Sequence, residues 1–135
     1  MGISNGIINF MNHTTTSGNE EIIRSMFSEN PIYVYLLSVF MAPFIEELVF
    51  RKSLKKIIPI NWLFIIASGL IFGGAHLIGN TSSIIDYFYI IPYGSFGVAF
   101  AYIYAKTDNI LVSSSLHFMH NGLLMALQFF ILIFA

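Results

Sequence analysis

Residues 32–51 read IYVYLLSVFMAPFIEELVFR, an almost wholly apolar run with two adjacent carboxylates and one arginine near its end. A charged side chain at the centre of a membrane helix costs about 2.5–3.5 kcal/mol on insertion scales, so such residues usually have a partner and a task. Glu47 and Arg51 are four residues apart with the acid first, the favourable order for an ion pair on a helix. Glu46 lies about 100° round the helix from Glu47 and faces elsewhere. We interpret Glu47 and Arg51 as a neutralising pair and Glu46 as a candidate functional group.

The composition predicts a protein that lies in a lipid bilayer. Of its 135 residues, 56% are hydrophobic and only 10% are charged, and the mean hydropathy is +0.76. A soluble domain carries about 25% charged residues, so most of this surface is not expected to face water. The net charge of −1 gives no indication of nucleic-acid binding. The absence of cysteine excludes disulfides, thiolate zinc sites and cysteine nucleophiles.

The apolar segments predict an all-α, polytopic membrane protein with about four transmembrane helices. We place them at about residues 32–56, 61–78, 84–105 and 110–135, with Pro59 in the first turn. Gly69 and Gly73 form a GxxxG motif on the second helix, which lets another helix approach closely. Pro92 and Gly94 predict a kink in the third helix.

The chain divides into an N-terminal segment, residues 1–31, and a four-helix core, residues 32–135. Residues 13–19 are loop-like, so we expect no task for His13, and residues 20–27 form a short amphipathic helix at the membrane interface. No cleavable signal peptide is recognisable. Lysines follow the first and third membrane helices, at positions 52, 55, 56 and 106. The positive-inside rule therefore places these turns in the cytoplasm and both termini outside, and we expect the site to open toward the cytoplasm.

Three further polar residues lie within the apolar helices: His76 in the second, and His117 and Asn121 in the fourth. At about 1.5 Å per residue from the nearest turn, Glu46 lies roughly 20 Å and His76 roughly 25 Å along antiparallel helices, hence at nearly one level. His117 and Asn121 share a helix face, and His120 could also face inward. His117 lies roughly 12 Å along the fourth helix, so Glu46, His76 and His117 share one layer if the first hairpin protrudes at its lysine-rich end.

An acid and two imidazoles in a shielded pocket suit amide hydrolysis without a covalent intermediate. A carboxylate can take a proton from water and return it to the leaving amine, while a histidine and an asparagine donate hydrogen bonds to the oxyanion. A zinc ion held by Glu46, His76 and His117 is an alternative, but no His-Glu-x-x-His motif supports it, and we expect no metal or cofactor. The serines at 113–115 are expected to pack or to bond their own helix backbone.

Three motifs on three helices together resemble those of a known family: Glu46-Glu47-x-x-x-Arg51, Phe72-x-x-x-His76 and His117-x-x-x-Asn121. They are similar to the motifs of the CAAX-protease and bacteriocin-processing (CPBP, or Abi) intramembrane endopeptidases, over about residues 32–124. The resemblance implies a glutamate-dependent protease in which Glu46 activates water with help from His76. It also implies that His117 and Asn121 hold the oxyanion, with Glu47 and Arg51 in support. The implied substrate is a peptide or a lipidated protein within the membrane.

Members of that family carry further helices before the first motif, so a partner membrane protein, a second copy or upstream sequence would be needed to enclose the pocket. The expected location is the cell membrane of a bacterium, in contact with lipid. Two other functions stay open from the residues alone. One is a non-catalytic membrane protein that acts by contact, such as a bacteriocin immunity factor or a sensor-kinase modulator. The other is a proton-coupled transporter, which the lack of repeated halves disfavours.

Overall fold

The structure is a computed structural model that describes residues 17–79, 81 and 84–134. Throughout these residues the regular structure is helical, which confirms the expected all-α class. The first part of the N-terminal segment, residues 1–16 with His13, lies outside the described residues, as does Ala135 at the end of the fourth helix. The remainder of that segment forms α2 (Gly18–Glu29), where the sequence predicts a short amphipathic helix.

The first membrane helix runs without a break from Pro31 to Ile57. It comprises α3 (Pro31–Leu36), η1 (Leu37–Met41), α4 (Ala42–Glu47), η2 (Leu48–Ser53) and α5 (Leu54–Ile57), in which η1 and η2 are π-helical. Pro31 occupies the first turn, where the missing N–H is not needed. Ile58 then adopts an extended conformation ahead of Pro59, which ends the helix as predicted.

Helix α6 (Asn61–Ala75) and helix α7 (Ile90–Thr107) cross at very short range through glycines. A Cβ atom on Gly73 would lie 2.9 Å from the backbone nitrogen of Gly94, and one on Gly97 would lie 2.9 Å from the Cα of Gly69. The GxxxG motif of Gly69 and Gly73 therefore contacts α7. The backbone irregularity expected at Pro92 lies just before it, as the 3₁₀ segment η3 (Ile84–Tyr89), so that Pro92 falls in the first turn of α7.

Among the described residues, three helices are long and apolar enough to cross a membrane: 31–57, 84–107 and 110–127, the last within α8 (Ile110–Phe134). Helix α6 is shorter, with 15 residues, and ends at Ala75 rather than near Ile78 as predicted. Large apolar side chains face outward along these helices; Ile32 is 77% exposed and Leu123 is 72% exposed. Such a surface belongs in lipid, so the chain is a membrane protein.

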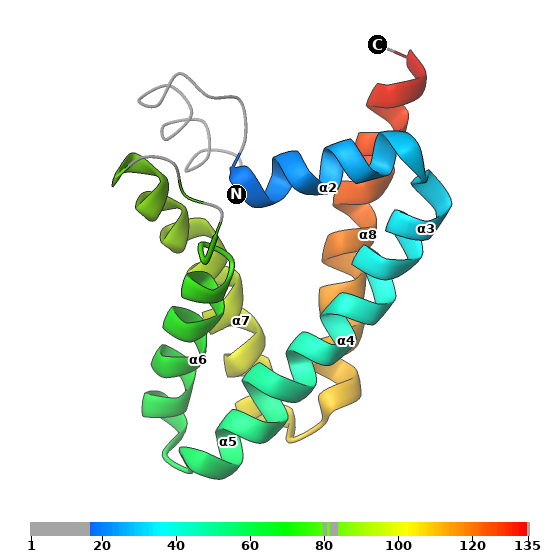
Figure 1. Cartoon of the computed structure of the whole chain (residues 1–135). Coiled ribbons are helices and arrows are strands. Elements are labelled where there is room, and N and C mark those ends of the chain that lie inside the picture. Colours follow the sequence, from blue (N-terminus) through cyan, green and yellow to red (C-terminus); the bar gives the residue numbers. More distant parts are fainter. Residues whose placement is uncertain (1–16, 80, 82–83, 135) are drawn as a thin grey trace.

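The helices form two groups that meet near the lysine-bearing turns and diverge away from them (Figure 1). Helices α6 and α7 form one group, and α3–α5 with α8 form the other. Helix α2 crosses between them at the end opposite α5. Near α5 the groups are joined by a core of Phe64, Ala101 and Tyr104, with Leu54 and Ile110 packed against it. This core fills the lysine-bearing end of the bundle.

Candidate active site

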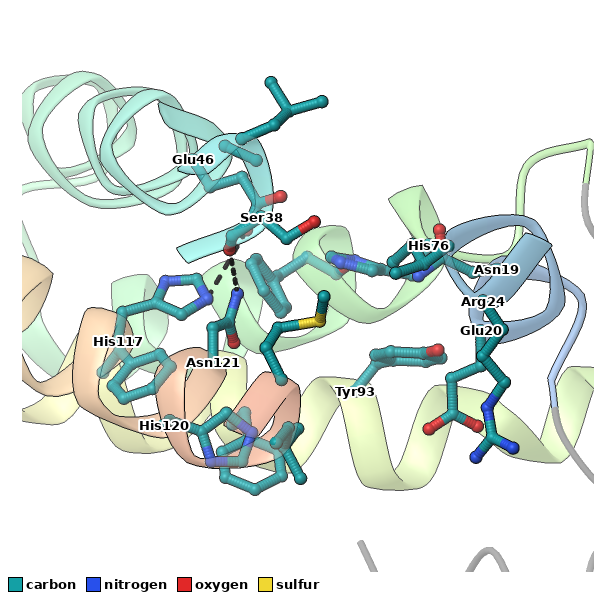
Figure 2. Close-up of a pocket in the computed structure, with 18 of the residues that line it drawn as sticks. Asn19, Glu20, Arg24, Ser38, Glu46, His76, Tyr93, His117, His120 and Asn121 are labelled. Atoms are coloured by element: carbon teal, nitrogen blue, oxygen red, sulfur yellow. Dashed lines mark hydrogen bonds and ion pairs between the residues drawn. The ribbon is translucent and has the colours of Figure 1, made fainter. Parts of the chain in front are cut away.

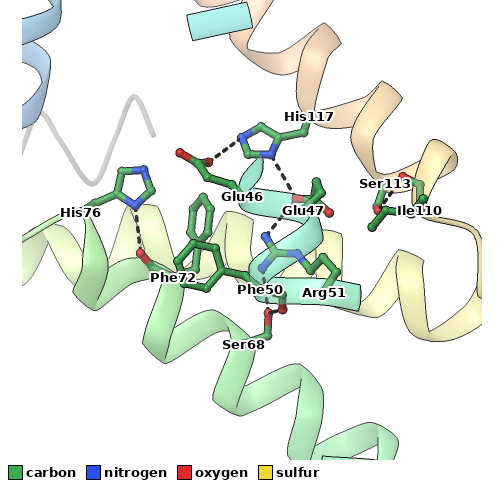
Figure 3. A network of polar contacts seen from close by, with 10 residues as sticks. All are labelled: Glu46, Glu47, Phe50, Arg51, Ser68, Phe72, His76, Ile110, Ser113 and His117. Carbon is green, nitrogen blue, oxygen red and sulfur yellow. Dashed lines mark hydrogen bonds and ion pairs between the residues drawn. The ribbon is translucent and has the colours of Figure 1, made fainter. Parts of the chain in front are cut away.

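Glu47 and Arg51 form a buried ion pair, as their spacing predicts. Both are 0% exposed, and Arg51 Nη2 lies 3.2 Å from Glu47 Oε1 (Figure 3). Arg51 Nη1 donates a 2.7 Å hydrogen bond to the Ser68 hydroxyl, which in turn donates to the backbone carbonyl of Phe50. The guanidinium also lies 4.9 Å from the centre of the Phe72 ring. This network joins the first membrane helix to α6 directly below Glu46.

His117 lies between the two glutamates. Its Nδ1 is 3.1 Å from Glu47 Oε1, and its Nε2 is 3.6 Å from Glu46 Oε2 (Figure 3). The Glu47 carboxylate, which is paired with Arg51, can only accept hydrogen bonds. His117 Nδ1 therefore carries a hydrogen and is the donor in its hydrogen bond to Glu47. The same ring stacks on Phe100, with centroids 4.6 Å apart. Glu47 therefore sets the orientation of the imidazole and directs Nε2 toward Glu46.

His76 follows the last residue of α6 and is held by its own helix end. Its Nδ1 lies 2.9 Å from the carbonyl oxygen of Phe72, one turn earlier. A carbonyl oxygen only accepts, so this contact places a proton on Nδ1, and it satisfies a carbonyl that the helix terminus leaves without an intrahelical partner. The ring also stacks on Tyr93 of α7, with centroids 4.6 Å apart and planes 19° from parallel.

Asn121 is held by a backbone carbonyl in the π-helical turn η1 of the first membrane helix. Its Nδ2 donates a 2.9 Å hydrogen bond to the carbonyl oxygen of Ser38, 83 residues away. That carbonyl is available because the N–H of Ala42 bonds to Leu37 in the π-helical turn, and Pro43 has no N–H to offer. One amide hydrogen of Asn121 is thus used by Ser38, and the second can serve another acceptor.

The four predicted site residues Glu46, His76, His117 and Asn121 line one cavity of about 390 Å³ (Figure 2). Its walls come from α2, from the first membrane helix and from α6, α7 and α8. Glu47 and Arg51 lie behind it and do not line it. A carboxylate, two imidazoles and an amide around a largely apolar space are suited to polarising water and to binding an oxyanion.

The cavity extends from Glu46 toward α2 rather than toward the lysines. Asn19, Glu20, Ile23 and Arg24 of α2 contribute to its lining, and α2 lies at the end of the bundle opposite α5 (Figure 1). The core around Phe64 packs the lysine-bearing end, so the cavity does not extend to that end of the bundle. The side of the membrane that the cavity faces stays a prediction.

Several contacts at the site were not predicted from the sequence. The sequence did not single out Ser68, which bonds to Arg51, or Tyr93, which stacks on His76. His120, whose role the sequence left open, lines the cavity and lies against Phe96, with ring centroids 4.0 Å apart. Ser113 donates to the carbonyl of Ile110 on its own helix, as expected for these serines. Among the described residues, no three His, Cys, Asp or Glu side chains are placed to hold one metal ion.

Comparison with known proteins identifies the family. Residues 28–123 match the family model described as Type II CAAX prenyl endopeptidase Rce1-like. The chain is 27% identical over 119 residues to "UPF0177 protein YvdC" of Lactococcus lactis subsp. lactis (strain IL1403), which covers 87% of this chain and 44% of that protein. It is 28% identical over 115 residues to "Putative membrane peptidase YdiL" of Bacillus subtilis (strain 168), which covers 83% of this chain and 43% of that protein.

The chain thus spans less than half the length of these curated relatives. No solved structure gave a significant match. The family match covers most of the chain, including every residue of the three sequence motifs. This helical membrane protein therefore belongs to the Type II CAAX prenyl endopeptidase Rce1-like family.

Proposed function

We propose that this chain is an intramembrane endopeptidase that hydrolyses a peptide bond with a water molecule activated by Glu46. The observation that carries the proposal is the position of the Glu46 carboxylate, 3.6 Å from His117 Nε2 on the wall of a cavity that His76 and Asn121 also line. Placing a carboxylate and imidazoles inside a membrane bundle costs free energy, and a functional site accounts for the presence of residues with this cost. The family match supports peptide hydrolysis as that function.

In the proposed reaction, water attacks the carbonyl carbon of the scissile bond while Glu46 takes one of its protons. His76 helps to orient the water. The carbonyl oxygen becomes an oxyanion, to which the second amide hydrogen of Asn121 donates a hydrogen bond. His117 also donates to it from Nε2, which in this proposal requires an imidazolium that is protonated on both nitrogens and keeps its Nδ1–H on Glu47. Glu46 then returns the proton to the nitrogen as the C–N bond breaks, leaving an amine and a carboxylic acid that keeps the second proton of the water. Glu47 and Arg51 support the reaction by holding His117.

The proposed substrate is a peptide or lipidated protein that reaches the cavity within the membrane. The proposed location is the bacterial cell membrane, crossed several times, with the lysine-bearing turns in the cytoplasm. For the division of the chain, we propose a catalytic core of residues 32–135 preceded by an N-terminal segment, residues 1–31, whose helix α2 lies across the cavity. A second copy or a partner membrane protein is a further proposal, to be tested by the oligomeric state of the active form.

The test uses purified full-length chain in lipid vesicles with two quenched fluorescent peptides, one farnesylated at a C-terminal CAAX motif and one bearing a leader sequence. Glu46→Gln should lower turnover about 10²–10⁴-fold. Glu29→Gln, at an exposed position on α2 that does not line the cavity, is the matched control and should cleave normally. Turnover retained by Glu46→Gln would contradict the mechanism. A cellular phenotype that survives both Glu46→Gln and His117→Ala would instead indicate a protein that acts by contact.

A further inference from the structure

Tyr93 contacts both His76 and the helix that covers the cavity. Its ring stacks on the His76 imidazole, with centroids 4.6 Å apart and planes 19° from parallel. Its hydroxyl lies 2.7 Å from the Ser17 hydroxyl at the start of α2. Tyr93 is 6% exposed and Ser17 is 3% exposed, so this hydrogen bond is sheltered from water. Figure 2 shows the Tyr93 ring next to His76, with α2 and its residues Asn19, Glu20 and Arg24 to the right of both.

His76 is contacted by its own helix and by α7. It lies just beyond the end of α6, and its Nδ1 contact with Phe72 comes from its own helix end. Phe72 also lies against the ring, with centroids 4.5 Å apart and planes 44° from parallel. Tyr93 adds a flat surface from a different helix, α7. A ring held from two helices keeps its orientation better than one held by its own helix end alone.

Helix α2 is anchored at both ends above the cavity. At its start, Ser17 caps the helix by accepting from the N–H of Glu20, and the same hydroxyl bonds to Tyr93. Near its end, Phe27 is 1% exposed and packs with Val34, Val39 and Met125. Ile23, between these ends, lines the cavity. The position of α2 and the position of Tyr93 are therefore linked through the Tyr93 hydroxyl, which bonds to Ser17 and to the side chain of Asn19.

We propose that Tyr93 is a positioning residue for His76 and that Ser17 holds Tyr93, so that α2 must lie across the cavity for His76 to be correctly oriented. The inference rests on the proposed function, in which His76 orients the attacking water. It assigns α2 a second effect besides covering the cavity. When α2 lies across the cavity, it also orients His76 for catalysis.

A spectroscopic test is independent of catalysis. The full chain, labelled with ¹³C in its histidines, reports the imidazole tautomer through the Cδ2 chemical shift, and His76→Gln assigns the signal. Ser17→Gly removes the hydroxyl while retaining a tolerated helix cap. We expect Ser17→Gly and Tyr93→Leu both to lower the fraction of His76 protonated on Nδ1. Tyr102→Phe, on the exposed side of α7, should leave this fraction unchanged. An unchanged tautomer fraction in both test variants overturns the proposal.

A kinetic test separates positioning from simple covering. Ser17→Gly and Tyr93→Phe should each lower kcat about five-fold, the effect of one hydrogen bond, and the double variant should be no worse than either. If α2 only walls the cavity, KM rises and kcat is unchanged, which overturns the proposal. If the wild-type chain cleaves neither peptide, the proposed function fails, while the tautomer measurement still decides whether α2 and Tyr93 orient His76.

Discussion

Nδ1 of His117 lies 3.1 Å from Oε1 of Glu47, so a histidine on the cavity wall is bonded to a carboxylate that lies behind that wall. The two adjacent glutamates therefore differ in their surroundings. The Glu47 side chain is fully buried and paired with Arg51, whereas the Glu46 side chain is 25% exposed and lines the cavity. Their roles should be separable by mutation.

Glu47→Gln is expected to destabilise the protein by about 3–5 kcal/mol, because it leaves the buried Arg51 without its counter-charge. Glu46→Gln should change stability by no more than about 1 kcal/mol, because Glu46 is partly exposed and makes no buried ion pair with Arg51. Thermal unfolding in detergent, followed by circular dichroism, measures both. Equal stability of the two variants would contradict the assigned difference.

The glycine contacts of α6 and α7 predict opposite effects for two alanine substitutions. Gly97→Ala places a Cβ 2.9 Å from the Cα of Gly69, a backbone atom that cannot rotate away, and should cost about 1–3 kcal/mol. Gly74→Ala meets nothing within 4 Å and should be neutral or stabilise by up to about 1 kcal/mol through helix propensity. Unfolding midpoints of the two variants give the comparison. A neutral Gly97→Ala would mean that the helices cross elsewhere.

Much of this arrangement could be predicted from the sequence because charges in an apolar run are conspicuous. The four-residue spacing of Glu47 and Arg51 predicts their ion pair, and Pro31 and Pro59 predict where the first membrane helix begins and ends. The same reasoning selected four polar residues that line one cavity, although their chemical roles stay predictions.

The unpredicted features depend on contacts between distant segments. Ser17 and Tyr93 are 76 residues apart, and neither has a local pattern that indicates the other. The carbonyl of Ser38 becomes available to Asn121 through a π-helical turn, which leaves no signal in hydrophobic periodicity beyond the presence of Pro43. The end of the bundle toward which the cavity extends could not be predicted, because lysines report on membrane orientation and not on which end of the bundle is packed.

The freed carbonyl of Ser38 predicts a role for Pro43 in holding Asn121. Asn121→Ala should lower kcat about 10²–10³-fold, as expected for the loss of an oxyanion donor. Pro43→Ala restores a backbone N–H that can compete for the helix carbonyls, and a smaller fall in kcat is expected with the fold retained. Pro31→Ala, at the start of the same helix, is the control and should leave kcat unchanged. Full activity of Pro43→Ala would show that Asn121 needs no such support.

Membrane orientation can be tested directly because the chain has no cysteine. Lys56→Cys lies at the lysine-bearing end and Ser28→Cys lies on the exposed side of α2. In intact bacteria, a membrane-impermeant maleimide should label Ser28→Cys and should reach Lys56→Cys only after permeabilisation. The opposite labelling would place the α2 side of the cavity in the cytoplasm.

The most direct measurement is a single turnover in H₂¹⁸O with enzyme in excess over a cleavable peptide, followed by mass spectrometry of both the product and the enzyme. Direct attack by a water molecule activated by Glu46 predicts ¹⁸O in the new carboxylate of the product and none in the Glu46 side chain, with no cleavage by Glu46→Gln. Unlabelled product together with ¹⁸O in Glu46 would show a covalent intermediate and would contradict the proposed mechanism.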